Sequence, residues 1–180
     1  MTTFVSLFRG INVGGHQIIR MDGLKELHIS LGCKDVVTYI QSGNVIFTSD
    51  DVDPAQLTKQ IEDGFTQKFG FHVNVMVRTS AELQEVIANN PFQHQPLKES
   101  KWVVVLFLTT SPEHTAVEEL QKAYVGPEEF WLIGQELYIY YPNGMGRSKL
   151  TNTLIEKKLK TSGTGRNWNT ILQLQKLSQR

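Results

Sequence analysis

The sequence has a single cysteine, Cys33, and this scarcity excludes several classes of protein at once. One thiol cannot form a disulfide within the chain or build a cysteine-rich metal site, and we expect a reducing, cytoplasmic location. The five histidines never occur at the H-x-x-x-H spacing of a zinc helix, so no metal site is predicted. No cofactor is predicted either. The longest apolar run, residues 102–108, is far shorter than the roughly 20 residues of a membrane span, and Arg9 interrupts the apolar start. We therefore expect neither a membrane anchor nor a secretory signal.

An excess of charge is also missing, since 18 basic residues balance 18 acidic ones. The distribution is nevertheless uneven. Residues 81–146 carry a net charge of −6, whereas residues 147–180 carry eight basic residues against Glu156 alone, a net charge of +7. A basic segment of this kind indicates a nucleic-acid or phosphate partner, or a segment that docks on the acidic middle of the same chain or faces solvent. The sequence leaves these alternatives open.

The first half of the chain alternates strand and helix periods. The pattern predicts an order of βαββαβ, the split βαβ arrangement of the ferredoxin-like plait. The predicted strands and helices are, in chain order, residues 3–9, 21–31, 36–41, 44–48, 54–69 and 72–78.

The second half nearly repeats this order after a connector at residues 90–100. The closing strand is missing from the pattern, and a helix over residues 168–177 takes its place. We therefore predict an α+β protein of two ferredoxin-like subdomains, residues 1–90 and 91–180, the second lacking its last strand and ending in an extra helix. The predicted elements of the second half are residues 80–89, 102–108, 112–124, 130–133, 137–141, 148–160 and 168–177.

The loop after the first predicted strand is the leading candidate for a ligand site. Glycines let backbone N–H groups approach an anion closely, as in a nest. A phosphate loop is excluded, because His16-Gln17 stands where Lys-Ser/Thr would be required. The alternative is a merely tight strand-to-helix connection. The candidate contacts in this loop are Arg9, Asn12, Gly14, Gly15 and His16.

A second candidate is the predicted turn between residues 41 and 44. Ser42 and Asn44 are expected at the same end of the sheet as the glycine-rich loop. Ser42 lacks the G-x-S-x-G context of a nucleophile elbow, so a turn serine is favoured over a catalytic one.

The third candidate precedes a predicted helix near residue 148. Ser148 is predicted as the N-cap, which would expose helix N–H groups to an anion. Arg147 and Lys149 would add a planar guanidinium and a point charge. An ordinary cap flanked by two solvated cations is the alternative.

A fourth glycine-rich segment, residues 161–168, is predicted as a basic turn that opens the last helix. Arg166 and Asn167 are its candidate ligand contacts. Trp168 could stack on a base, but its helical spacing favours an anchor in the hydrophobic core. We hypothesise that the loops at the helix starts converge on one electropositive pocket.

Four of the segments discussed above carry a family resemblance: Leu7–Gly15, Tyr39–Val45, Gly146–Asn152 and Arg166–Trp168. They resemble the domain of unknown function 1697 family of bacterial proteins, over essentially the whole chain. The resemblance implies two ferredoxin-like α+β subdomains. It implies no activity, so no catalytic residue is carried over.

These observations favour a protein that binds a small anionic or phosphorylated ligand through glycine-rich loops and helix N-termini. One alternative is a nucleic-acid-binding module that uses the basic C-terminal segment, with strong dependence on salt. A second is an enzyme acting on a phosphorylated metabolite with His16 as acid or base. A regulatory or assembly protein is a further possibility, so the sequence leaves open whether the protein is an enzyme.

Overall fold

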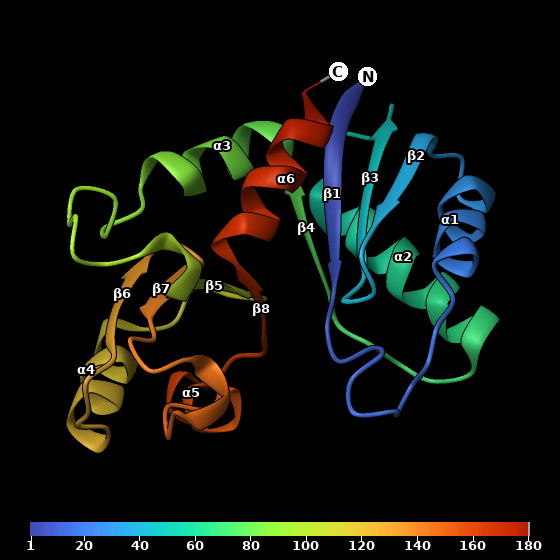
Figure 1. Ribbon diagram of the computed structural model, residues 1–180. Coiled ribbons are helices and arrows are strands. Elements are labelled where there is room, and N and C mark those ends of the chain that lie inside the picture. The colour runs from blue at the N-terminus through green and yellow to red at the C-terminus, as the bar shows by residue number, and fades with distance from the viewer. Residues whose placement is uncertain (180) are drawn as a thin grey trace. The chain divides into compact units, whose positions relative to one another are not determined.

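The computed structural model describes residues 1–179 and divides the chain into two compact units (Figure 1). Unit 1 contains residues 1–85 and the end of the chain from Gln173 onward, and unit 2 contains residues 86–172. Helices α3 (Ser80–Ala88) and α6 (Trp168–Ser178) each run from one unit into the other. The structure groups the end of α6 with unit 1. The division into subdomains of residues 1–90 and 91–180 stays a prediction.

Unit 1 contains a four-stranded antiparallel sheet in the order β2-β3-β1-β4. Strand β1 is central, with Ser6 opposite Val45 on one side and Val77 on the other. All six elements predicted for residues 3–78 are present, with ends shifted by up to three residues. They are β1 (Thr2–Phe8), α1 (Met21–Ser30), β2 (Lys34–Tyr39), β3 (Asn44–Ser49), α2 (Pro54–Phe69) and β4 (Val75–Thr79).

The core of unit 1 lies between the sheet and the helices α1 and α2 (Figure 1). Helix α2 begins with a proline and a side-chain cap: Pro54 stands in its first turn, and the Asp53 carboxylate accepts a hydrogen bond from the Ala55 N–H at 3.0 Å. The helix ends at Gly70, whose φ of 84° is readily adopted only by glycine. The core is aromatic, with Phe4, Phe8, Phe47 and Phe65 all fully buried.

Unit 2 contains a second four-stranded antiparallel sheet, in the order β6-β7-β5-β8. Its core is mainly aliphatic and lies between the sheet and the helices α4 and α5. The chain therefore has a mixed α/β fold with two antiparallel sheets and, within residues 1–179, six α-helices. The elements of unit 2, besides parts of α3 and α6, are β5 (Val103–Leu108), α4 (His114–Ala123), β6 (Glu129–Ile133), β7 (Glu136–Tyr140), α5 (Asn152–Leu159) and β8 (Gly163–Asn167).

Strand β8 corrects the prediction that the second half lacks its last strand. Gly163–Asn167 pairs antiparallel with β5, with Gly165 opposite Leu106. A Cβ atom added at Gly163 would lie 2.8 Å from Leu108 Cδ2 and 2.9 Å from Leu106 Cγ. The strand was missed because its inner positions are glycines that make room for leucines of the neighbouring strand, and they give no hydrophobic alternation.

Helix α5 corrects a second prediction, the N-cap at Ser148. Residues Met145–Arg147 form a short 3₁₀ turn, and α5 begins only at Asn152. The cap is Thr151, whose Oγ1 accepts a hydrogen bond from the Leu154 N–H at 3.2 Å. No helix within residues 1–179 combines the length and apolar character that a membrane-spanning helix requires.

Candidate functional site

The glycine-rich loop of unit 1 is a tight turn that projects from the end of β1. The His16 N–H donates a hydrogen bond to the Val13 carbonyl at 3.0 Å. The two residues between them, Gly14 and Gly15, have φ values of 58° and 76°. Positive φ at both central positions is the pattern of a type I′ turn, which strongly favours glycine. Residues 13–18 are exposed, so this turn offers backbone and imidazole groups to solvent.

The side-chain amide of Asn12 makes hydrogen bonds within the protein that hold this loop in place. Its Nδ2 donates to the Gln41 carbonyl at 2.8 Å, and its Oδ1 accepts from the Ile19 N–H at 2.7 Å. Its own backbone N–H donates to the Gln17 carbonyl at 3.0 Å. Asn12 therefore ties the loop to the β2–β3 connection and to the start of α1.

Asn44 and Ser42 shape the connection between β2 and β3. Asn44 is fully buried, and its Nδ2 donates to the Tyr39 carbonyl and to Ser42 Oγ, both at 2.9 Å. The connection spans residues 40–43, longer than the predicted two-residue turn. The Phe8 N–H donates to the Gly43 carbonyl at 2.9 Å, which places this connection beside the end of β1, as predicted.

A hollow of about 330 Å³ lies beside this loop, where α1 begins. The residue before the helix, Arg20, is exposed and makes no side-chain capping bond. The first N–H groups of a helix have no partner inside the helix and attract anions. The sequence interpretation did not single out Arg20 or Gln41, although an arginine directly before a helix start was a usable signal. The hollow is lined by Ile18, Ile19, Arg20, Met21, Asp22 and Gln41.

The candidates before α5 belong to unit 2, and the structure assigns them different roles. Arg147 and Lys149 are exposed. Ser148 Oγ donates to the Glu128 carboxylate at 2.8 Å and accepts from the Leu150 N–H at 3.0 Å. Burial acts to raise the pKa of the Glu128 carboxylate. Hydrogen bonds from Tyr124 and Ser148 nevertheless hold this pKa below its ordinary value. An ionised carboxylate beside Ser148 disfavours an anion at that hydroxyl.

Arg166 and Asn167, predicted in a turn, lie on β8. Arg166 is 5% exposed; its Nη1 donates to Thr164 Oγ1 at 2.7 Å and to the Gly165 carbonyl at 2.9 Å. Burial lowers the pKa of Arg166 to about 10. Asn167 is the N-cap of α6, because its Oδ1 accepts from the Thr170 N–H at 2.8 Å. Trp168 is buried at 7% exposure, as expected of a core anchor.

Three candidate residues in each unit are exposed. They are Gly14, Gly15 and His16 in unit 1 and Arg147, Lys149 and Asn167 in unit 2. Arg9 is half-buried, and its backbone N–H donates to the Asn74 carbonyl at 3.0 Å. Convergence of the loops of the two units on one pocket stays a prediction. No group of three or more His, Cys, Asp or Glu side chains in the described part of the chain is placed to hold a metal ion.

One buried titratable group was not identified from the sequence as part of any site. His28 is fully buried: its Nδ1–H donates to the Leu24 carbonyl at 2.7 Å, and its Nε2 accepts from Ser6 Oγ at 2.9 Å. Burial lowers the pKa of His28 to about 4, although the bond to Leu24 acts in the opposite direction. Cys33 is buried, and burial raises the pKa of its thiol to about 11, so it is not a poised nucleophile.

Fold and site define a mixed α/β protein with two four-stranded antiparallel sheets and an exposed glycine-rich loop. The model of the family described as "Protein of unknown function (DUF1697)" matches residues 1–138, and the chain belongs to this family. The match includes the first two resemblance segments and ends before Gly146.

A solved structure, that of the conserved bacterial protein SP0830 from Streptococcus pneumoniae, is similar over the full length. The two chains share 22% identity with a TM-score of 0.79, and the similarity covers 99% of each chain. At this identity the likeness concerns the fold alone. A comparison with curated proteins finds no match.

Proposed function

We propose that this protein binds a small anionic or phosphorylated ligand in unit 1, at the start of α1. The observation that carries the proposal is the hollow of about 330 Å³ lined by Arg20 beside the exposed turn of Gly14, Gly15 and His16. A guanidinium presents two parallel donors to a phosphate, and the helix N-terminus adds a favourable dipole.

The hydrogen bonds of Asn12 and Asn44 support the proposal because they hold the walls of the hollow in advance. Asn12 joins the loop to Gln41, a lining residue, and Asn44 holds the connection that carries Gln41. A preformed site loses less entropy on binding. The lining also contains one carboxylate, Asp22, which limits the hollow to a ligand with one anionic group at this position.

Substitution of Arg20 by glutamine tests the proposal most directly. We expect Arg20→Gln to weaken binding of small phosphorylated metabolites about tenfold or more, since a hydrogen bond to a charged group contributes about 1.5–3 kcal/mol. A thermal-shift screen followed by calorimetry measures this. Lys25→Gln, an exposed cation of α1 outside the lining, is the matched control.

Unchanged affinity of Arg20→Gln would refute this site. Arg147→Gln and Lys149→Gln, made together, test whether the cations of unit 2 act on the same ligand. Binding only of oligonucleotides, with steep loss at higher salt, would favour the nucleic-acid alternative instead. No hydrogen bond orients the His16 side chain among the described residues, so we assign it no acid–base role.

We also infer that each unit is a variant of the ferredoxin-like plait. The strand orders β4-β1-β3-β2 and β8-β5-β7-β6, each with two helices between the strands in a βαββαβ sequence, support this inference.

A further inference from the structure

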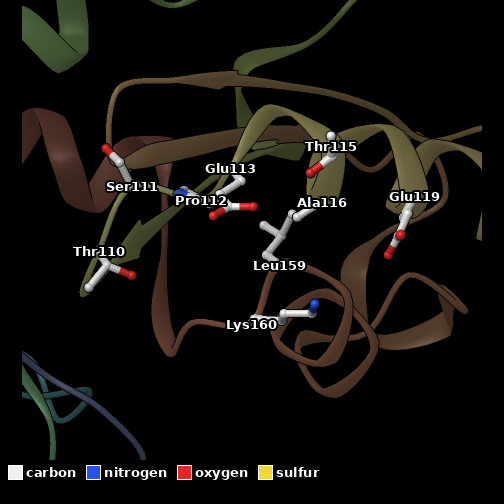
Figure 2. A pocket seen from close by; sticks show the side chains of 9 residues that line it. All are labelled: Thr110, Ser111, Pro112, Glu113, Thr115, Ala116, Glu119, Leu159 and Lys160. Carbon is white, nitrogen blue, oxygen red and sulfur yellow. The ribbon is translucent and has the colours of Figure 1, made fainter.

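Unit 2 contains a second hollow that is separate from the site proposed above. It has a volume of about 250 Å³ and lies between residues 110–113, helix α4 and the end of α5 (Figure 2). Figure 2 shows the side chains of Glu113, Glu119 and Lys160 around it, with Ala116 and Leu159 between them.

The three charged side chains of this hollow are not used by the fold. Within residues 1–179, Glu113, Glu119 and Lys160 take part in no ion pair and no side-chain hydrogen bond. Some charged side chains of unit 2 are paired, as Lys98 is with Glu129 at 2.8 Å. Two carboxylates and one ammonium facing one hollow therefore form a set of charges available to a ligand.

The walls of the hollow are held by hydrogen bonds that do not involve those charges. Thr110 Oγ1 donates to Thr161 Oγ1 at 2.8 Å, and Ser111 Oγ donates to the Gly134 carbonyl at 3.3 Å. Lys160 ends α5 in the left-handed conformation, with φ of 57°, and its N–H donates to the Glu156 carbonyl at 2.9 Å. The buried side chains of Ala116 and Leu159 form an apolar base. The charges are thus displayed on a preformed surface.

The composition of the lining excludes several kinds of ligand. A net charge of −1 disfavours a phosphate or another anion. Two carboxylates are too few to enclose a calcium ion, which takes 6–8 oxygen ligands. Hydroxyls and charges outnumber the apolar groups, so an apolar ligand would leave them desolvated without partners.

We propose that this hollow binds a small molecule with two cationic groups and one carboxylate, the charge pattern of a basic amino acid. Glu113 and Glu119 would each accept from one cationic group, and Lys160 would donate to the carboxylate. Glu113 directly precedes α4 and Glu119 lies six positions later, a rise of about 9 Å along the helix axis, which suits the two ends of an extended basic amino acid. The net charge of +1 on the ligand complements the −1 of the lining.

Calorimetry with the full chain and L-lysine, L-ornithine and L-arginine tests the proposal, with 1,4-diaminobutane and L-glutamate as comparison probes. We expect saturable binding of a basic amino acid and none of L-glutamate. Glu113→Gln and Glu119→Gln should each weaken that binding about tenfold or more. Lys160→Gln should weaken binding of the amino acid but not binding of the diamine, because only the amino acid carries a carboxylate.

Matched controls are available on the same helices. Glu118→Gln on α4 and Lys157→Gln on α5 remove the same charges outside the lining and should leave affinity unchanged. Glu113 makes no capping bond and Lys160→Gln keeps a non-glycine residue at positive φ, so the variants should fold like the parent; circular dichroism checks this. No binding of any basic amino acid, or equal loss in the control variants, would overturn the proposal. The site proposed for unit 1 is tested separately. A loss of anion binding that is confined to Arg20→Gln would concern that site alone.

Discussion

Unit 1 and unit 2 arrange four strands in the same order but complete their sheets with different residues. The edge strand of unit 1, β4, has the apolar sequence Val75-Met-Val, whereas the corresponding β8 of unit 2 begins Gly163-Thr-Gly. Each pairs antiparallel with the central strand beside it. An edge strand therefore needs backbone pairing and a fit to its neighbour, and either large or very small side chains can provide that fit.

The cores of the two units differ in the same way. Unit 1 packs a cluster of phenylalanines around His28, and unit 2 packs leucine, isoleucine and valine, with Tyr141. All three tryptophans, at positions 102, 131 and 168, lie in unit 2. Tryptophan fluorescence therefore reports on unit 2, while circular dichroism reports on both units, and the comparison can be tested one unit at a time.

Phe65→Ala is expected to have the largest effect. Phe65 is fully buried in unit 1, with ring centroids 5.6 Å from Phe8 and 4.6 Å from Phe69. Removal of a buried phenyl ring should lower the free energy of unfolding by about 3–5 kcal/mol. Urea titrations followed by circular dichroism measure the loss. An effect below about 1 kcal/mol would mean that the aromatic cluster is not the main core of unit 1.

The buried imidazole should make unit 1 sensitive to acid. The unfolded chain protonates His28 near its ordinary pKa of 6.5, but the folded protein does so only near 4. The unfolded state therefore binds more protons between these values, and the free energy of unfolding should fall by about 3 kcal/mol as pH is lowered from 6.5 to 4. His94 and His114 of unit 2 are exposed, so no buried histidine makes the stability of that unit depend on pH in the same way.

Stability measured at several pH values, for the parent and for His28→Gln, checks this prediction. The variant should lose the part of the pH dependence that His28 causes. An NMR titration in which the His28 ring protonates near pH 6.5 would contradict the burial argument.

Gly163→Ala probes the contact that allows β8 to join its sheet. The added methyl group would lie within 3 Å of Leu106 and Leu108, and such overpacking costs about 1–3 kcal/mol. Gly165→Ala is the control, because its Cβ would lie 3.3 Å from Val104 and should cost less. Thermal unfolding measures the stability of both variants. Small and equal decreases in stability would show that β8 does not carry glycine because of this close approach.

The helix caps should have the smallest effects. Thr151→Ala removes the cap of α5 in unit 2 and Asp53→Ala removes that of α2 in unit 1, and each should cost about 1 kcal/mol. Denaturant unfolding of both variants measures the losses. Were Thr151→Ala to leave stability unchanged, α5 would not depend on this cap.

The local sequence predicted much of unit 1 because each element there carries its own signals. Pro54, the apolar spacing of α2 and Gly70 act within one helix, so neighbouring residues suffice to predict it. The candidate loop at residues 9–16 was recognised for the same reason: its consecutive glycines mark a turn with positive φ. The family resemblance of residues 7–15 and 39–45 also followed from short local segments.

The hydrogen-bond partners of the polar residues followed from the folded structure and not from the local sequence. Asn12, Asn44 and Ser148 are predicted ligand contacts, and the structure shows that the side chain of each makes hydrogen bonds within the fold. Strand β8 fits against leucines that lie more than 50 residues earlier in the chain. The hollow of unit 2 is lined by residues from the start of α4 and from the end of α5. Local propensity contains no record of such long-range packing, and packing determines which side chains hold the fold and which stay exposed.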